Sequence, residues 1–166
     1  MPIKSPAEMA KEIRAAIKAK GIPARQVSVR SGYCGYSDYI HIDIKNGRIN
    51  IKDIEAIARP YEDVRIDEYT GETLMGANTY IRVKYDDHAF DDIIPENIDR
   101  AKKLLADISA VTDNTVIPAG NEIFLVKERS NNNICLHDQK KFGRMYIHSP
   151  EQLAKSLYTL ENYGVM

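Results

Sequence analysis

Hydrophobic residues in the first half of the chain follow a helical spacing and then a strand spacing. After Ser5 they recur every three or four residues up to Gly21, and Ser5 with Glu8 forms a capping-box pattern, so a helix is predicted here. Alternation of apolar and polar residues, strict in Ser37–Lys45, predicts strands at Ala24–Arg30, Ser37–Lys45 and Thr79–Tyr85. A short helix that Asn50 caps and Pro60 stops, and a short strand around Val64, complete the order αββα(β)β.

The second half predicts two further helices with short strands between them. One helix begins at Pro95 and runs to about Ala110, and the other begins at Ser149 and runs to about Asn162. Hairpin strands are expected at Thr115–Ile117, Ile123–Lys127, Ile134–Leu136 and Arg144–His148. The pattern indicates an α+β protein with a small antiparallel sheet and helices packed on one face.

Length and composition favour a compact protein. At 166 residues, the chain fits one globular body, which we expect to comprise a unit over residues 1–85 and an extension over residues 86–166 packed with it. The formal net charge is −1, so no global field attracts nucleic acid. There is no apolar run of membrane-spanning length and no apolar signal core, so we expect a cytoplasmic protein without a membrane partner. Cys34 and Cys135 are expected to be free thiols in that compartment.

Three segments of the first half carry a family resemblance. A Lys/Arg-bearing helix leads into Val27-Ser28-Val29-Arg30-Ser31 and a loop rich in tyrosine and glycine. The alternating strand Tyr39–Ile44 precedes a helix that ends in Pro60-Tyr61-Glu62. Asp67-x-Tyr69 then leads to Tyr80-Ile81-Arg82-Val83. In these features the chain resembles the large polyvalent protein-associated domains, most closely the one numbered 29.

The resemblance implies a cellular setting rather than a reaction. Such domains occur in polyvalent proteins of phages and conjugative elements and as stand-alone proteins, and they are thought to help incoming DNA establish itself. The family offers no catalytic residues to carry over. This chain departs from the pattern at Cys34, where a small polar residue is expected. Residues 86–166 lie outside the resemblance.

A candidate binding surface surrounds the tyrosine-rich loop and the strand that follows it. Aromatic rings beside guanidinium groups stack on single-stranded bases, and they also anchor protein partners. The alternative is that these rings only cover the edge of the core. The candidate residues are Arg25, Arg30, Tyr33, Cys34, Tyr36, Tyr39, His41 and Arg82.

Signs of catalysis or metal binding are sparse. Cys34 and His41 form the one pair that suggests a nucleophile with a base, and no orienting acid can be placed beside them. The acidic run Asp86–Asp92 lacks the spacing of a calcium loop, and His137, Asp138 and His148 fit no standard zinc pattern. We therefore expect no cofactor and no metal.

The preferred hypothesis is a non-enzymatic binding module associated with a phage or conjugative element. Its partner is expected to be a protein, either a host factor or a second copy of the chain. One alternative is an accessory factor for single-stranded nucleic acid, in which Arg25, Arg30, Arg82 and Lys84 contact phosphates while Tyr33 and Tyr36 stack bases. The other is an enzyme built on Cys34 and His41.

Overall fold

The computed structural model describes residues 4–74, 76, 78–111, 115–120, 122–128, 133–138 and 143–164, with the side chain of Cys34 outside the description. The chain divides into two compact units, Met1–Ala89 and Phe90–Met166, close to the boundary expected at residue 85. The expected packing of the two parts into one body stays a prediction. The α+β class is confirmed.

The helices of the first unit begin where capping chemistry predicts. In α1 (Pro6–Ala19) the Ser5 hydroxyl accepts a hydrogen bond from the Glu8 amide, and the Glu8 carboxylate accepts one from the Ser5 amide. In α2 (Ile51–Ala58) the Asn50 side chain accepts from the Lys52 amide. A single turn of 3₁₀ helix, η1 (Arg59–Tyr61), follows α2.

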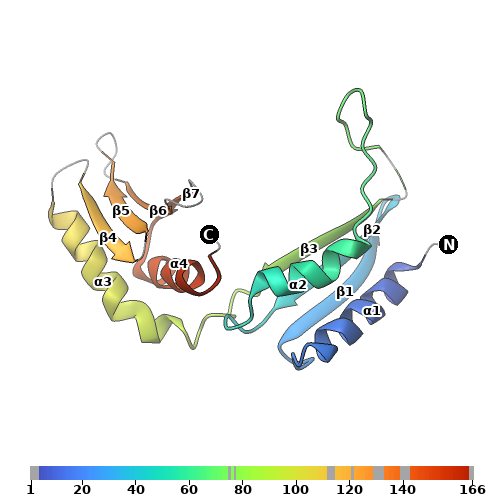
Figure 1. Ribbon diagram of the computed structural model, residues 1–166, viewed down its shortest axis with the longest axis horizontal. Helices are drawn as coiled ribbons and strands as arrows, with labels where there is room; N and C mark the ends of the chain where they lie inside the picture. Colours follow the sequence, from blue (N-terminus) through green and yellow to red (C-terminus); the bar gives the residue numbers. More distant parts are fainter. Residues whose placement is uncertain are drawn as a thin grey trace. The chain divides into compact units, whose positions relative to one another are not determined.

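The first sheet has the order β1-β2-β3, formed by Val27–Cys34, Ser37–Ile44 and Thr79–Tyr85. The expectation of a wholly antiparallel sheet is wrong here, because β2 and β3 are parallel. The helix α2 lies between β2 and β3 in the sequence. It is part of the connection that returns the chain to the end of the sheet at which β2 begins, so that β3 runs in the same direction as β2 (Figure 1). A connection of this kind joins parallel strands, whereas a tight turn joins antiparallel ones.

The β1–β2 hairpin is longer than the alternation predicts. Residues 31–34, expected in a loop, continue β1, and the turn is only Gly35 and Tyr36. Gly35 has φ of 61°, and two-residue hairpin turns need such a positive φ at this position. The expected strand around Val64 is reduced to isolated bridges, Asp63 with Thr79 and Ile66 with Thr73.

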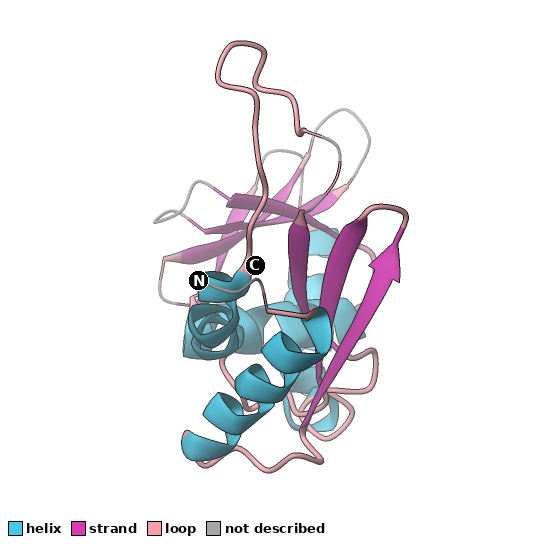
Figure 2. Cartoon of the chain, turned by 90° about the vertical axis from the view of Figure 1, so that its right-hand side faces the viewer, coloured by secondary structure: helices cyan, strands magenta, loops and turns pink. Residues whose placement is uncertain are grey.

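The core of the first unit lies between the sheet and its two helices. Ile40, Ile42 and Ile44 of the central strand are completely buried against apolar residues of α1 and α2. Both helices therefore cover the same face of the sheet (Figures 1 and 2). The alternate residues of each strand are on the opposite face.

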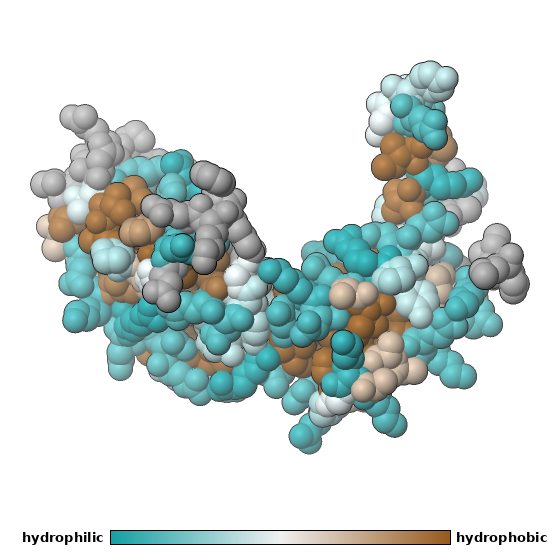
Figure 3. All heavy atoms as spheres, viewed as in Figure 1, coloured by the Kyte–Doolittle hydropathy of each residue, from teal (hydrophilic) through white to brown (hydrophobic). Residues whose placement is uncertain are grey.

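A hairpin-like arm extends from the first unit between η1 and β3 (Figures 1 and 2). Backbone hydrogen bonds pair its two sides, with the Leu74 amide donating to Arg65 and the Asp67 amide donating to Glu72. Exposed large hydrophobic residues of this arm are Ile66, Tyr69 and Leu74. Figure 3 shows hydrophobic atoms, in brown, along the arm.

The second unit packs two helices against a four-stranded antiparallel sheet. The helices are α3 (Ile94–Ala110) and α4 (Pro150–Tyr163). The strands, in sheet order, are β4 (Val116–Gly120), β5 (Ile123–Lys127), β6 (Ile134–Asp138) and β7 (Gly143–Ile147). Leu125, Leu136 and Leu153 are buried between the two layers. In the described residues, no helix is both long and apolar enough to span a membrane.

Candidate binding face of the first sheet

The face of the first sheet opposite its helices carries aromatic and charged side chains in register. The pairing places three cross-strand rows on this face: Gly32–Tyr39–Tyr80, Arg30–His41–Arg82 and Ser28–Asp43–Lys84. Because residues two apart along a strand share a face, these rows form one continuous surface, which we call the open face.

Three rings stand side by side at the centre of the open face. The Tyr39 and Tyr80 ring centroids are 5.2 Å apart with planes inclined by 21°. The Tyr39 and His41 centroids are 6.0 Å apart with planes inclined by 8°. All three side chains are partly exposed, so the row combines ring–ring contact with access to solvent.

Cationic side chains lie beside these three rings on the open face. Arg82 and Lys84 are exposed on β3, and Arg30 is exposed on β1. The acidic residue of the three cross-strand rows is Asp43, whose side chain is only 7% exposed. Its carboxylate lies 2.5 Å from the Arg30 guanidinium and 3.8 Å from the Lys84 ammonium. The negative charge of Asp43 is thus paired with two cations. Arg82 has no carboxylate partner among the described residues. The three cross-strand rows of the open face therefore carry a net positive charge.

Shallow pockets lie at both ends of the ring row. One, of about 340 Å³, is lined by Tyr39, His41, Arg30 and the exposed Tyr33. The other, of about 360 Å³, lies between Tyr80, the β1–β2 turn and the base of the arm. Volumes in this range suit small planar groups. Together the pockets and the rings make one track across the hairpin end of the sheet.

The structure brings together most, but not all, of the residues predicted for the site. Arg30, Tyr39, His41 and Arg82 share the open face, as the register shows. Tyr33 and Tyr36 are 75% and 82% exposed at the hairpin end, next to the two pockets. Arg25 is not part of this group, because it precedes β1 at the opposite end of the strand.

The backbone keeps Cys34 away from His41. Cys34 pairs with Ser37, and His41 lies four positions further along β2 with Tyr39 between them. Four strand residues span about 13 Å, far beyond the reach of a thiol–imidazole hydrogen bond. The side chain of Cys34 lies outside the described residues. The arrangement of strands therefore does not support the nucleophile–base pair.

Sequence reasoning left Tyr80 and Lys84 out of the principal site. Both lie on β3, and only the parallel register places them beside Tyr39 and Asp43. The available signal was the alternation in Thr79–Tyr85, which puts both residues on the polar side of the strand. Alternation predicts which face of its own strand a residue occupies, but it does not predict which strand lies next to it in the sheet.

Two titratable side chains of the second unit, Cys135 and His137, have pKa values that burial shifts. Burial raises the pKa of the Cys135 thiol to about 11. Burial also lowers the pKa of His137, whose Nε2 has no hydrogen-bond partner among the residues that the structure describes. Within the described ranges, no three His, Cys, Asp or Glu side chains lie close enough to hold a metal ion.

Comparison with known proteins yields no match to this chain among protein-family models, curated proteins or solved structures. The resemblance to the large polyvalent protein-associated domains stays a prediction. The case for function therefore depends on the geometry of the open face.

Proposed function

We propose that the chain is a non-enzymatic binding protein whose first unit binds single-stranded nucleic acid on the open face. The observation that carries this proposal is the ring row Tyr80–Tyr39–His41, with Arg30 and Arg82 on either side of His41. Aromatic rings on a sheet stack bases with little regard to sequence, and nearby cations hold the phosphates.

Local charge supports nucleic acid despite the overall charge of −1. The rows carry three cations and a single carboxylate, and that carboxylate is already paired. A field of this kind acts over about 8–10 Å at physiological salt, so charges elsewhere on the chain matter less than those beside the rings. The two end pockets add places for further bases next to Tyr33 and Tyr36.

The test is binding of fluorescein-labelled dT and rU 12-mers, measured by anisotropy over a range of salt concentrations. The Tyr39→Leu substitution should weaken binding about 5- to 160-fold, because one base–ring stack contributes about 1–3 kcal/mol. Tyr146→Leu is the matched control, since it removes a partly exposed tyrosine from the second unit. Equal affinity for wild type and Tyr39→Leu would contradict the proposal.

Charge variants give a second, independent test. Arg82→Ala should reduce the slope of log affinity against log salt by about 0.7, the loss of one phosphate contact, while Arg25→Ala should leave it unchanged. Asp43→Asn should tighten binding, because it removes the negative charge that holds Arg30 and Lys84. A protein partner that survives nuclease treatment, with no oligonucleotide retained, would favour the protein-binding hypothesis instead.

A further inference from the structure

The strand β1 forms an edge of the first sheet, and its outward backbone groups are available for pairing. Lys45 donates its amide to the Gln26 carbonyl, which sets the alternation of the β1–β2 ladder. In an antiparallel pair, every second residue turns its backbone groups away from the partner strand. By this alternation the N–H and C=O groups of Val27, Val29 and Ser31 point to the open edge.

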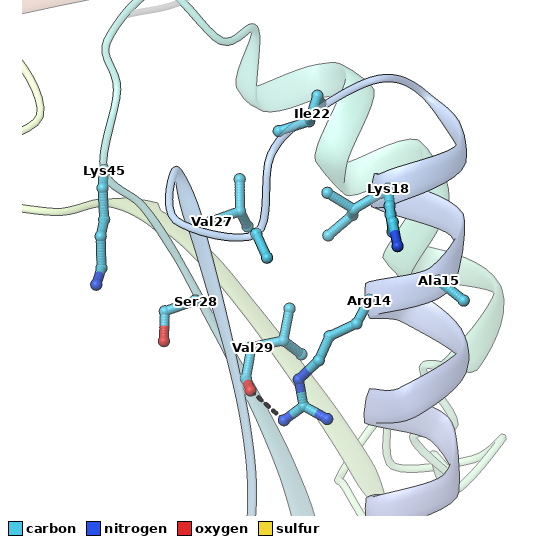
Figure 4. A pocket seen from close by; sticks show the side chains of 10 residues that line it. Arg14, Ala15, Lys18, Ile22, Val27, Ser28, Val29 and Lys45 are labelled. Carbon is cyan, nitrogen blue, oxygen red and sulfur yellow. Dashed lines mark hydrogen bonds between the residues drawn. The ribbon is translucent and has the colours of Figure 1, made fainter.

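Little of this edge is blocked. The Arg14 guanidinium reaches across from α1 and donates a 2.5 Å hydrogen bond to the Val29 carbonyl (Figure 4). Among the described residues, the outward amides of Val29 and Ser31 have no acceptor. The edge thus offers consecutive donors and acceptors at strand spacing.

A groove of about 440 Å³ runs beside this edge, between α1 and β1 (Figure 4). Its apolar lining comes from Ile17, Ile22, Val27 and Val29. A strand laid along β1 would direct alternate side chains into this lining.

The charges of the groove have one sign. Its charged lining residues are Arg14, Lys18 and Lys45, and the lining contains no carboxylate. Lys18 and Lys45 have no ion-pair partner among the described residues. A second copy of the same edge would bring these cations against one another, which is unfavourable. An acidic strand would instead meet complementary charge.

We infer that the β1 edge and the α1–β1 groove bind an extended acidic peptide by strand addition. Apolar side chains of the peptide enter the groove at alternate positions. The carboxylates between them turn to the other side of the added strand, the side of β1 on which Lys45 lies (Figure 4). The Arg14 bond to Val29 is exchanged for backbone pairing, and Arg14 and Lys18 add positive charge beside the bound strand. The groove lining shares no residue with the two pockets of the nucleic-acid track, so either proposal can fail without the other.

The experiment uses the full chain and a labelled ten-residue peptide that alternates valine with glutamate. Anisotropy should show binding at least tenfold tighter than that of a peptide alternating valine with lysine. N-methylation of alternate amides in the acidic peptide should abolish binding if it pairs as a strand. Equal binding of the acidic and basic peptides, or of the N-methylated peptide, would overturn the inference.

Two substitutions locate the site. Ser31→Pro removes an outward amide without breaking the β1–β2 ladder and should reduce peptide affinity at least tenfold, while Ser31→Ala should not. Lys18→Glu changes an exposed residue of α1 and should weaken acidic-peptide binding even if Ser31→Pro folds poorly. Lys18→Glu should not alter oligonucleotide binding, because Lys18 lines neither pocket of the nucleic-acid track. Unchanged peptide affinity in Lys18→Glu would place the peptide elsewhere.

Discussion

The two units share an arrangement but differ in the sheet face that their helices leave uncovered. In the first unit, one cross-strand row of that face is Arg30–His41–Arg82. In the second, a row of the corresponding face is Val116–Val126–Cys135–Tyr146. The faces toward the helices are apolar in both units, because both must bury a core.

This difference shows which part of a two-layer α+β unit is constrained. The helix-facing residues must be apolar for the unit to fold. The residue types on the other face are not constrained by this core and can suit whatever that face contacts. Cys135 is completely buried although it belongs to the face turned away from α3 and α4. The polar and aromatic row of the first unit is therefore the stronger candidate for recognition of a charged ligand.

The largest expected effects test whether each unit has its own stability. Ile42→Ala in the first unit and Leu136→Ala in the second should each lower the free energy of unfolding by about 2–5 kcal/mol, because both side chains are completely buried. Amide hydrogen exchange in increasing urea would resolve the two units. We expect each substitution to affect its own unit. If either substitution destabilised both units equally, the view that the two cores are independently stable would be wrong.

A smaller effect is expected at the Ser-Pro starts of α1 and α4. Each serine side chain accepts a hydrogen bond from the amide three residues later, Glu8 in one case and Gln152 in the other. Ser5→Ala and Ser149→Ala should each cost about 1 kcal/mol in the unit that contains the serine. Ser109→Ala, near the end of α3, provides a control without a cap. If thermal melts showed that Ser109→Ala lowers the melting temperature as much as the two cap variants do, the prediction would be contradicted.

The smallest effect concerns pH and is specific to the second unit. Burial lowers the pKa of His137, so the folded unit binds fewer protons at this site than the unfolded chain does. The resulting stability is present above the unfolded pKa of about 6.5 and is lost as the pH falls below that value, through the lowered pKa of the folded unit. His137→Gln should flatten the dependence of urea midpoints on pH between 7 and 5. An unchanged slope would show that His137 is not the group that titrates.

Much of the fold could be predicted from local signals. Ser5 and Ser149 mark helix starts because a serine at the N-cap meets a free amide, and this chemistry needs no distant partner. The isoleucines of β2 reveal a buried face through their spacing alone. The pairing of β2 with β3 could not be obtained in this way, since the alternation in Thr79–Tyr85 is the same in parallel and antiparallel sheets.

The candidate site shows the same division between local and long-range information. Tyr39 and His41 share a strand, so their common face follows from spacing. Tyr80 joins them only through the parallel register, and Arg25 is excluded only by the position of β1 in the fold. The peptide groove also escaped prediction, because edge strands are defined by the absence of a neighbour.

The crossover through α2 has a consequence for synthesis of the chain. The β1–β2 hairpin leaves the ribosome before β3, which must cover the second edge of β2 and follows only after α2 and the whole arm. During that interval the isoleucine-rich central strand has one edge open, and such intermediates are prone to aggregate. Slow translation over residues 62–78 would lengthen this exposure, so the yield of folded protein should depend on the codons of the arm as well as on the residues of the core.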